Sequence, residues 1–352
     1  MRILFSGALN TQSSTGWQRC DTLKRLGNDV YEFDDSGYRT RAERRILRRL
    51  DGRGFVKAEV ERFNRDLLRM IVNYDAEIIW IEKGLMLQRE TLSRIARLRP
   101  KSMKISYQDD NPFGGREYEV PLWKEFIGNI PYYDLHFVKR DSDIIEFVKR
   151  GARAAKLFMT GYYSPLFEKL PEPNPNGSCW DVSFMGTLID DRGSIVDELM
   201  LRRGLNLHVF GRRWNRCAAY YLKSNRFHGP YGFEATPRII AESKVNLGFV
   251  SSSNRDEYAG RSLEIPAAGG FLLAERTVAH RALYREGVEA EFYSDVNELV
   301  DKCRFYIENI EARTAIAIAG RERTKHSDYS LTRSLTNALI VVSEQQARLR
   351  SL

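Results

Sequence analysis

The sequence predicts an α/β protein made of two domains, each built on a parallel sheet. The chain has 352 residues, which corresponds to about two domains of ordinary size. In both halves, short apolar segments alternate with amphipathic ones, as in consecutive βαβ units. Between the halves, residues 168–180 contain three prolines and no hydrophobic periodicity, which is typical of a linker.

The first half begins with a strand, a turn of small residues and a helix. The strand covers residues 2–5, and the helix covers 17–26, with Cys20, Leu23 and Leu26 on one face. A second strand follows at once, which completes a βαβ unit and predicts a parallel sheet. We expect a Rossmann-like domain over residues 1–168, with strands at residues 2–5, 30–33, 76–81, 104–107, 135–138 and 156–159.

The second half repeats the alternation after a linker at residues 169–180 and predicts a Rossmann-like domain over 181–335. Its expected strands are residues 182–186, 207–211, 245–250 and 270–274, and its clearest helices are 236–244 and 262–268. A terminal helix over 336–352 completes the chain. Because ligands bind at the carboxyl ends of parallel strands, we expect the two sheets to face a substrate cleft between the domains.

The composition excludes several classes of protein. With 43% hydrophobic residues, 25 Gly and 11 Pro, the chain is neither disordered nor fibrous. It has no run of about 18 apolar residues, so no membrane-spanning helix is expected, and its start resembles a strand rather than a signal peptide. Its four cysteines lie far apart, which predicts neither a zinc site nor a disulfide framework and favours the reducing cytoplasm.

The net charge of +8 has a local origin. Residues 39–69 alone hold 11 basic and 5 acidic side chains. One interpretation is a solvated amphipathic helix, because Val60, Phe63, Leu67 and Ile71 have helical spacing. The other is a surface for the inner membrane face, a lipid-linked intermediate or a polyanionic glycan. Nucleic acid ranks lower, because basic and aromatic residues are not interleaved there.

The most informative motif follows the third strand of the second half and begins a helix. Gly260 lets the backbone turn sharply and approach a ligand. The amides of Arg261, Ser262 and Leu263, with the Arg261 guanidinium, suit a diphosphate, and Glu264 suits paired sugar hydroxyls. The alternative is that Arg261 and Glu264 form an ordinary surface ion pair at i and i+3.

This segment resembles the donor-binding motif of GT-B glycosyltransferases, especially the CgeB-like (spore maturation protein-like) branch of group 1. The pattern R-x-x-E-I-x-A-x-G-G is matched by Arg261, Glu264, Ile265, Ala267, Gly269 and Gly270. Retaining families carry two acidic residues separated by seven intervening residues. Asp256 and Glu264 have this separation here, with Asp in place of the usual first Glu. Further segments match in order, at residues 83–84, 109–110, 133–134, 184–187, 210–214 and 228–231.

The resemblance implies an enzyme that moves a sugar from a nucleotide diphosphate sugar to an acceptor hydroxyl, with retention at the anomeric carbon and without a metal or other cofactor. It implies that Glu264 holds the ribose, that Asp256 contacts the donor sugar and that Arg261 and the following amides bind the diphosphate. The acceptor would be a glycan, a lipid-linked molecule or a protein. In related enzymes, the terminal helix crosses back to the first domain.

Further donor contacts are implied at other loops. Arg192 stands where relatives keep a phosphate-binding lysine, whereas Thr187 replaces their arginine, so Arg212 or Arg261 would supply the missing charge. The alternative for Arg192 and Arg212 is a solvated surface position. The resemblance places base contacts at His228 and Tyr231, although His228 is equally suited to a turn. The remaining donor-side residues are loop glycines, Gly16 and Gly186.

Two adjacent carboxylates are the candidates on the acceptor side. Asp109 and Asp110 follow a strand, so they are expected at the carboxyl edge, where they could orient or deprotonate an acceptor hydroxyl or stabilise positive charge at the anomeric carbon. Their alternative role is an Asx turn and helix cap. Two further functions stay open, a nucleotide-sugar 2-epimerase of the same fold and a non-catalytic GT-B binding or structural module.

Overall fold

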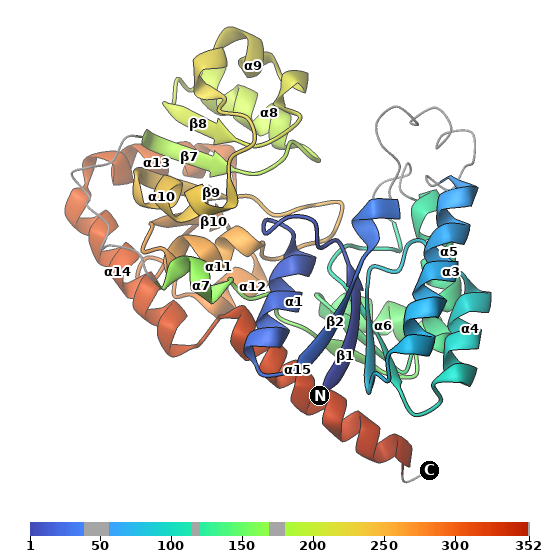
Figure 1. Cartoon of the computed structure of the whole chain (residues 1–352). Helices are drawn as coiled ribbons and strands as arrows, with labels where there is room; N and C mark the ends of the chain where they lie inside the picture. The colour runs from blue at the N-terminus through green and yellow to red at the C-terminus, as the bar shows by residue number, and fades with distance from the viewer. Residues whose placement is uncertain (39–55, 115–119, 169–179, 351–352) are drawn as a thin grey trace. The chain divides into compact units, whose positions relative to one another are not determined.

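The computed structural model describes residues 1–38, 56–114, 120–168 and 180–350 (Figure 1). The chain divides into two compact units: unit 1 is Met1–Thr160 with Leu331–Leu352, and unit 2 is Gly161–Ser330. The division after Thr160 precedes the expected linker, most of which lies outside the described residues. Each unit contains one parallel sheet, so the predicted α/β class with two parallel sheets is confirmed.

Unit 1 is built on six parallel strands in the order β2-β1-β3-β4-β5-β6. Each predicted strand is present: β1 Arg2–Gly7, β2 Asp29–Asp34, β3 Ile78–Glu82, β4 Met103–Gln108, β5 Leu135–Val138 and β6 Ala155–Leu157. From β1 the chain first adds β2 on one side and then returns to add β3 on the other. The carboxyl ends of β1 and β3 therefore form a topological switch point, the usual ligand position in such sheets.

One face of this sheet carries the main core of unit 1. The α-helices among the described residues of the unit are α1 Thr15–Arg25, α3 Lys57–Asn73, α4 Arg89–Leu98, α5 Val120–Asn129, α6 Asp141–Lys149 and α15 Leu331–Arg350. The predicted apolar stripe of α3 is buried against the sheet, with Phe63 2% and Leu67 0% exposed. The basic stretch is therefore an amphipathic helix from residue 57 onward, whereas residues 39–55 lie outside the described residues.

The last helix of the chain packs on the first. Contacts join α15 to α1, and Leu335, Ala338 and Val342 of α15 are buried (Figure 1). The amide of Gln346 also donates to the carbonyl of Glu77, which precedes β3. The terminal helix begins at Leu331, five residues before its predicted start, and completes unit 1 rather than unit 2.

Unit 2 is built on five parallel strands in the order β11-β10-β9-β7-β8. Their bounds are β7 Trp180–Met185, β8 Leu207–Phe210, β9 Ser243–Gly248, β10 Leu272–Glu275 and β11 Glu291–Tyr293. The helices are α7 Ser164–Phe167, α8 Arg192–Asp197, α9 Ala218–Leu222, α10 Thr236–Ala241, α11 Gly260–Ala267, α12 Val278–Leu283, α13 Val296–Glu308 and α14 Ile310–His326. Four strands were predicted, whereas β11, only three residues long, was not.

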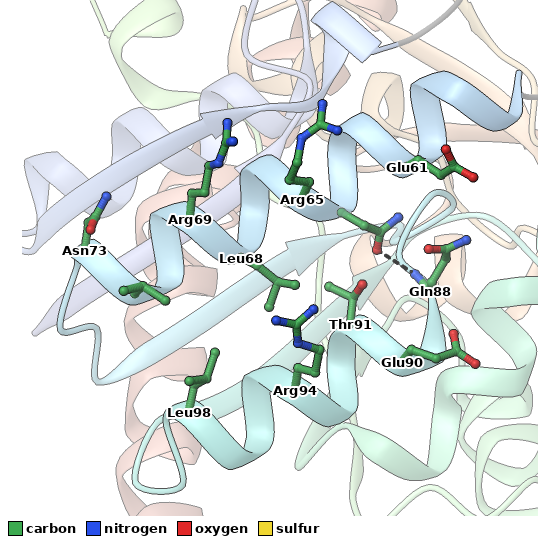
Figure 2. A pocket seen from close by; sticks show the side chains of 12 residues that line it. Glu61, Arg65, Leu68, Arg69, Asn73, Gln88, Glu90, Thr91, Arg94 and Leu98 are labelled. Atoms are coloured by element: carbon green, nitrogen blue, oxygen red, sulfur yellow. Dashed lines mark hydrogen bonds between the residues drawn. The ribbon is translucent and has the colours of Figure 1, made fainter.

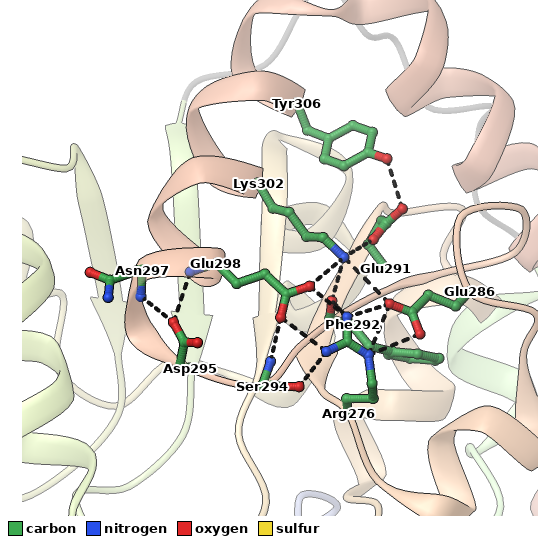
Figure 3. Close-up of polar contacts among 10 residues, drawn as sticks. All are labelled: Arg276, Glu286, Glu291, Phe292, Ser294, Asp295, Asn297, Glu298, Lys302 and Tyr306. Carbon is green, nitrogen blue, oxygen red and sulfur yellow. Dashed lines mark hydrogen bonds and ion pairs between the residues drawn. The ribbon is translucent and has the colours of Figure 1, made fainter.

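A network of charged side chains joins β10 and β11 of unit 2 to α13 (Figure 3). Arg276, directly after β10, lies 2.5 Å from carboxylate oxygens of both Glu286 and Glu298. Lys302 of α13 reaches Glu291 of β11, also at 2.5 Å. Since each cation is shared by several carboxylates, the network fixes the short strand β11 although its backbone offers few contacts of its own.

We expect Glu298→Gln to remove a contribution to stability of about 1 kcal/mol that depends on pH. Hydrogen bonds from Arg276 lower the pKa of Glu298 from 4.5 to about 2, against the opposing effect of burial. This contribution is therefore complete above pH 4.5 and is lost as the pH falls toward 2. Thermal unfolding of both proteins across this range should show a difference that narrows in acid.

The matched control is Glu308→Gln, at the exposed end of the same helix. It should unfold like the wild type at every pH. A constant difference between Glu298→Gln and the wild type down to pH 2 would contradict the assignment of the low pKa to this network.

Candidate functional site

The predicted donor motif forms the start of α11 in unit 2. The backbone N–H of Ala259 donates to the Ser262 hydroxyl at 3.1 Å, and the Ser262 N–H donates to the Ala259 carbonyl at 3.0 Å. The Ser262 hydroxyl also contacts Nε2 of the buried His280 at 2.7 Å. Ser262 therefore shapes the turn from within the protein, since both its amide and its hydroxyl are engaged, and the Leu263 side chain is likewise buried in the core.

Three of the predicted donor residues meet beside this helix start. The Arg261 guanidinium forms an ion pair with Glu264 and donates to the Tyr231 hydroxyl at 2.5 Å. The Arg261 and Glu264 side chains are 24% and 16% exposed, so the pair is half-buried rather than fully solvated. The ion pair between Arg261 and Glu264 is thus present. It belongs to a cluster that also contains Tyr231, which comes from a loop 30 positions earlier in the sequence.

His228 belongs to an aromatic stack next to this cluster. Its ring stacks on Phe210 at a centroid distance of 4.4 Å, and Phe210 in turn meets the ring of Tyr231 at 6.1 Å. Its Nε2 lies 2.9 Å from Nδ1 of His208. Burial lowers the pKa of His228, and burial together with Arg226 lowers the pKa of His208 to about 4, so both rings are neutral at neutral pH.

Two glycine loops at the carboxyl ends of β7 and β8 are joined closely. Gly211 has a φ of +153°, and a Cβ there would lie 2.0 Å from the Gly186 carbonyl oxygen, so no side chain fits. The Gly186 N–H donates to the Phe210 carbonyl, and Trp214 Nε1 donates to the Gly186 carbonyl at 2.9 Å. Gly186 therefore holds the two loops in register next to the Phe210 ring.

Arg192 is not the solvated surface arginine that its alternative interpretation required. Its side chain is buried, and its guanidinium donates to the carbonyls of Thr187 and Phe249, both at 3.1 Å. These bonds tie the loop after β7 to the loop after β9. Arg212, in contrast, is exposed, and its backbone carbonyl accepts the N–H of Leu188 at 3.0 Å.

The loop that carries Asp256 is held by Asp190, which was not among the predicted site residues. Asp190 accepts the hydroxyls of Ser251 at 2.7 Å and Ser253 at 2.6 Å. The N–H of Asp256 donates to the Ser251 carbonyl at 2.9 Å. Asp190 also has a φ of 52°, a backbone conformation that aspartate tolerates better than most residues, and this preference was the only available signal in the sequence.

In unit 1, the predicted acceptor carboxylates share one lysine. Lys83 Nζ lies 3.2 Å from Asp109 Oδ1 and forms an ion pair with Asp110. Burial opposes ionisation of Asp109, but Lys83 and Arg19 outweigh it and hold the pKa of that carboxyl well below its usual range. The Asx turn that was the alternative role belongs to Asn111, whose side chain accepts the Phe113 N–H at 3.1 Å.

A second charged pair lies at the switch point of the same sheet, and sequence reasoning missed it. Arg19 of α1 contacts both carboxylate oxygens of Glu82, at 2.9 and 2.5 Å, with both side chains almost fully buried. The guanidinium also lies 3.9 Å from the centre of the Tyr107 ring, and Trp80 Nε1 donates to Glu82 at 2.9 Å. A glutamate at the end of a buried strand was the signal that could have found it.

Gly16 has a different position from the one expected. It lies in the first turn of α1 rather than in the preceding loop, and it is buried. A Cβ there would lie 3.1 Å from the Ala8 carbonyl, which already accepts the Ser14 hydroxyl at 2.6 Å. Gly16 therefore allows α1 to begin close to the end of β1.

Among the described residues, no three His, Cys, Asp or Glu side chains gather as metal ligands would. No described helix combines the length and the apolarity needed to cross a membrane.

Comparison with known proteins gives one family match. Residues 192–339 match the family model described as glycosyl transferase-like. This segment contains every donor candidate of unit 2 except Gly186. No curated protein matches the chain.

Solved structures similar to the whole chain include three with two-sheet folds of this type. HepE of Anabaena in complex with UDP is 11% identical, with 98% of this chain and 100% of that chain covered and a TM-score of 0.64. Sucrose-phosphate synthase of Thermosynechococcus elongatus is 12% identical, with coverage of 99% and 100% and a TM-score of 0.72. An alpha-glucosyltransferase in complex with UDP is 10% identical, with coverage of 97% and 100% and a TM-score of 0.66.

Proposed function

We propose that the chain is a glycosyltransferase with the GT-B fold, which takes its sugar from a uridine diphosphate donor and passes it to an acceptor hydroxyl. Uridine is favoured as the base because two of the similar structures contain UDP. The R-x-x-E-I-x-A-x-G-G motif supports membership of the CgeB-like branch. The buried free thiols of Cys20, Cys217 and Cys303 are compatible with a cytoplasmic enzyme.

The observation that carries the proposal is the meeting of Tyr231, Arg261 and Glu264 at the start of α11. A diphosphate placed there would face the positive end of α11 and the Arg261 guanidinium, while Glu264 would accept hydrogen bonds from the ribose hydroxyls. In the structure, the Glu264 carboxylate is paired with the Arg261 guanidinium. On donor binding, phosphate oxygens would replace this carboxylate as the partner of Arg261. Such an exchange keeps Arg261 paired both before and after binding.

In the proposed reaction, the bond between the sugar C1 and the β-phosphate oxygen breaks, and UDP leaves with the bonding electrons. The acceptor oxygen forms the new bond to C1 and loses its proton to a base or to water. Arg261 stabilises the charge that develops on the leaving diphosphate. Asp256 would contact the donor sugar, and retention at C1 follows from the family resemblance of the Asp256 and Glu264 spacing.

On unit 1, Asp109 would orient the acceptor hydroxyl or stabilise positive charge near C1. Its low pKa makes it an anion throughout the ordinary pH range, so it accepts hydrogen bonds well and protons poorly. The acceptor is proposed to be a glycan, a lipid-linked molecule or a protein.

Thermal unfolding with UDP tests the donor site. UDP at about 100 times its Kd should raise the Tm by roughly 5–10 °C, since such saturation stabilises by about 2.7 kcal/mol. Glu264→Ala should abolish this shift, because the ribose hydroxyls lose their acceptor. Glu242→Ala, a helix-end glutamate in the same unit, is the control and should keep it. No shift with any nucleoside diphosphate would contradict the proposal.

A panel of nucleotide sugars then separates the three functions, with mass spectrometry to detect new glycosides and free UDP and NMR to detect donor isomers of equal mass. A transferase releases UDP and forms a new glycoside, or slowly hydrolyses its donor. A 2-epimerase converts the donor to an isomer without releasing UDP. A binding module changes none of the donors, although UDP still raises its Tm.

A further inference from the structure

Charge of one sign gathers on the segment that follows β8 in unit 2. Residues 212–226 hold five basic side chains and no acidic one. Four of these cations are exposed, and none of the four forms an ion pair with a described residue. Together with two exposed neighbours they form what we call the basic surface of unit 2, which consists of Arg212, Arg213, Arg216, Tyr221, Leu222 and Lys223.

The groove between α3 and α4 of unit 1 also contains arginines, but its charges are mixed (Figure 2). Glu61 and Glu90 line it as well, and Arg69 lies 3.4 Å from the Asp66 carboxylate. Neighbouring carboxylates therefore balance the cations of that groove. Those of residues 212–226 have no such balance, so the basic surface of unit 2 attracts an anion from outside more strongly.

The basic surface also exposes an aromatic ring. Tyr221 of α9 is 70% exposed, and the adjacent Leu222 is 68% exposed. The Tyr221 hydroxyl donates to the Asn215 carbonyl at 2.9 Å, which holds the ring in place although it lies at the surface. Because its hydroxyl is already bonded, this tyrosine offers a ligand the face of its ring.

A row of aromatic rings connects Tyr221 to the loops beside the donor cluster. The ring of Tyr220 lies 5.3 Å from that of Tyr221 and 5.4 Å from that of Phe227. Phe227 in turn lies 6.0 Å from the ring of Trp214, whose Nε1 donates to the Gly186 carbonyl. The exposed ring is therefore fixed before any ligand binds, which lowers the entropic cost of binding.

One carboxylate does contact this segment, and it stabilises the start of α9. Asp197 of α8 accepts the N–H groups of Ala218 at 3.1 Å and Ala219 at 2.6 Å. Its charge is used at the first turn of the helix that carries Tyr221. Asp197 therefore positions α9 without pairing with the exposed cations.

We propose that the basic surface of unit 2 binds an acidic glycan chain, with one sugar ring on the face of Tyr221 and anionic groups of the chain on the surrounding cations. The negative face of an aromatic ring attracts the C–H groups of a sugar, and guanidinium groups pair well with carboxylates. That this chain is the acceptor rests on the proposed function. Since the surface begins directly after Gly211, it would hold a part of the acceptor beyond the reacting sugar.

A nucleic acid fits this surface less well. Single strands stack successive bases on several aromatic side chains. Here Trp214 is 3% exposed and Tyr220 and Phe227 are only partly exposed, so Tyr221 provides the one fully exposed ring of the segment. The helix α9 has five residues, which is too short to read a duplex groove over several base pairs.

Titration calorimetry with short glycans tests the surface directly. The full chain should bind an oligogalacturonate and leave a neutral maltooligosaccharide of the same length unbound. The double variant Arg216→Gln, Lys223→Gln should weaken binding about tenfold at low salt, since each exposed ion pair contributes a few-fold. Tyr221→Ala should weaken it about fivefold, whereas Tyr221→Phe keeps the ring face and should stay within about twofold of the wild type.

The matched control is Arg238→Gln, Lys325→Gln, which removes one arginine and one lysine from exposed helix positions elsewhere on unit 2. It should bind the oligogalacturonate like the wild type. Equal losses in both double variants would mean that net charge alone matters, and this would overturn the surface. No binding by the wild type, or wild-type affinity in Tyr221→Ala, would overturn it as well. Tighter binding of an oligothymidylate of equal charge would assign the surface to nucleic acid instead.

Thermal unfolding keeps this test apart from that of the proposed function. Each variant should keep the wild-type Tm within about 2 °C, because the substituted side chains are exposed. The Tm shift with UDP should also be unchanged, since none of these residues belongs to the donor cluster. Glycan binding without a UDP shift would contradict the proposed function and support the surface. A UDP shift without glycan binding would overturn the surface and support the function.

Discussion

Asp109→Asn should slow UDP release from the donor by about 10²- to 10³-fold while leaving the Tm shift with UDP unchanged. The carboxylate is held as an anion by Lys83 and Arg19, and the amide that replaces it carries no charge to orient the acceptor or to stabilise C1. Asp110→Asn should cost less than about tenfold, because Lys83 keeps its pairing with Asp109. Steady-state rates of UDP release and thermal unfolding with UDP measure the two properties.

The pH dependence of the rate distinguishes an anion from a base. Since Asp109 stays ionised across the ordinary pH range, Asp109→Asn should lower the rate by the same factor at every pH. An acid limb that is present in the wild type and absent in the variant would show instead that Asp109 takes the proton. Asp141→Asn, at the exposed start of α6, serves as the control and should retain the full rate.

Arg261→Met should abolish the Tm shift with UDP and lower the rate of UDP release by about 10²- to 10³-fold. Methionine keeps much of the length of the side chain but offers no charge to the diphosphate, and it leaves Glu264 without its partner. Arg261→Lys should recover only part of the loss, because an ammonium group cannot bind two phosphate oxygens side by side. The two measurements are the Tm with and without UDP and the rate of UDP release.

Tyr231→Phe is the companion variant, because it removes one hydrogen bond from Arg261 and keeps the ion pair. Its rate should fall by less than about tenfold. A normal Tm shift in Arg261→Met would mean that this arginine only pairs with Glu264 on the surface of the helix.

Four strands of unit 1, β1, β3, β4 and β5, were predictable because they are short, largely buried runs between polar turns, whereas β2 and β6 are largely exposed. Ile78–Glu82 is an example, buried throughout. β11 escaped prediction because three residues, one of them Glu291, show no period, and the strand depends on Arg276 and Lys302 for its place. The hydrophobic pattern of three residues cannot predict a strand whose position depends on ion pairs with residues of another helix.

The positions of site residues could be predicted from the sequence where those residues directly follow a strand. Asp109 and Asp110 could be placed at a sheet edge, but the Lys83 backbone, with a φ of 59°, could not be foreseen for a lysine. Arg19 and Glu82 are 63 positions apart, and their pairing follows only once α1 is packed on the sheet. The role of Arg192 in tying two loops was likewise hidden, because an arginine in isolation is usually exposed.

The helices α1 and α15 pack on each other within unit 1, although the whole of unit 2 lies between them in the sequence. During synthesis, α15 leaves the ribosome only after all of Gly161–Ser330 has emerged. Unit 2 is continuous and can complete its fold first, whereas α1 of unit 1 must wait for the helix that packs on it.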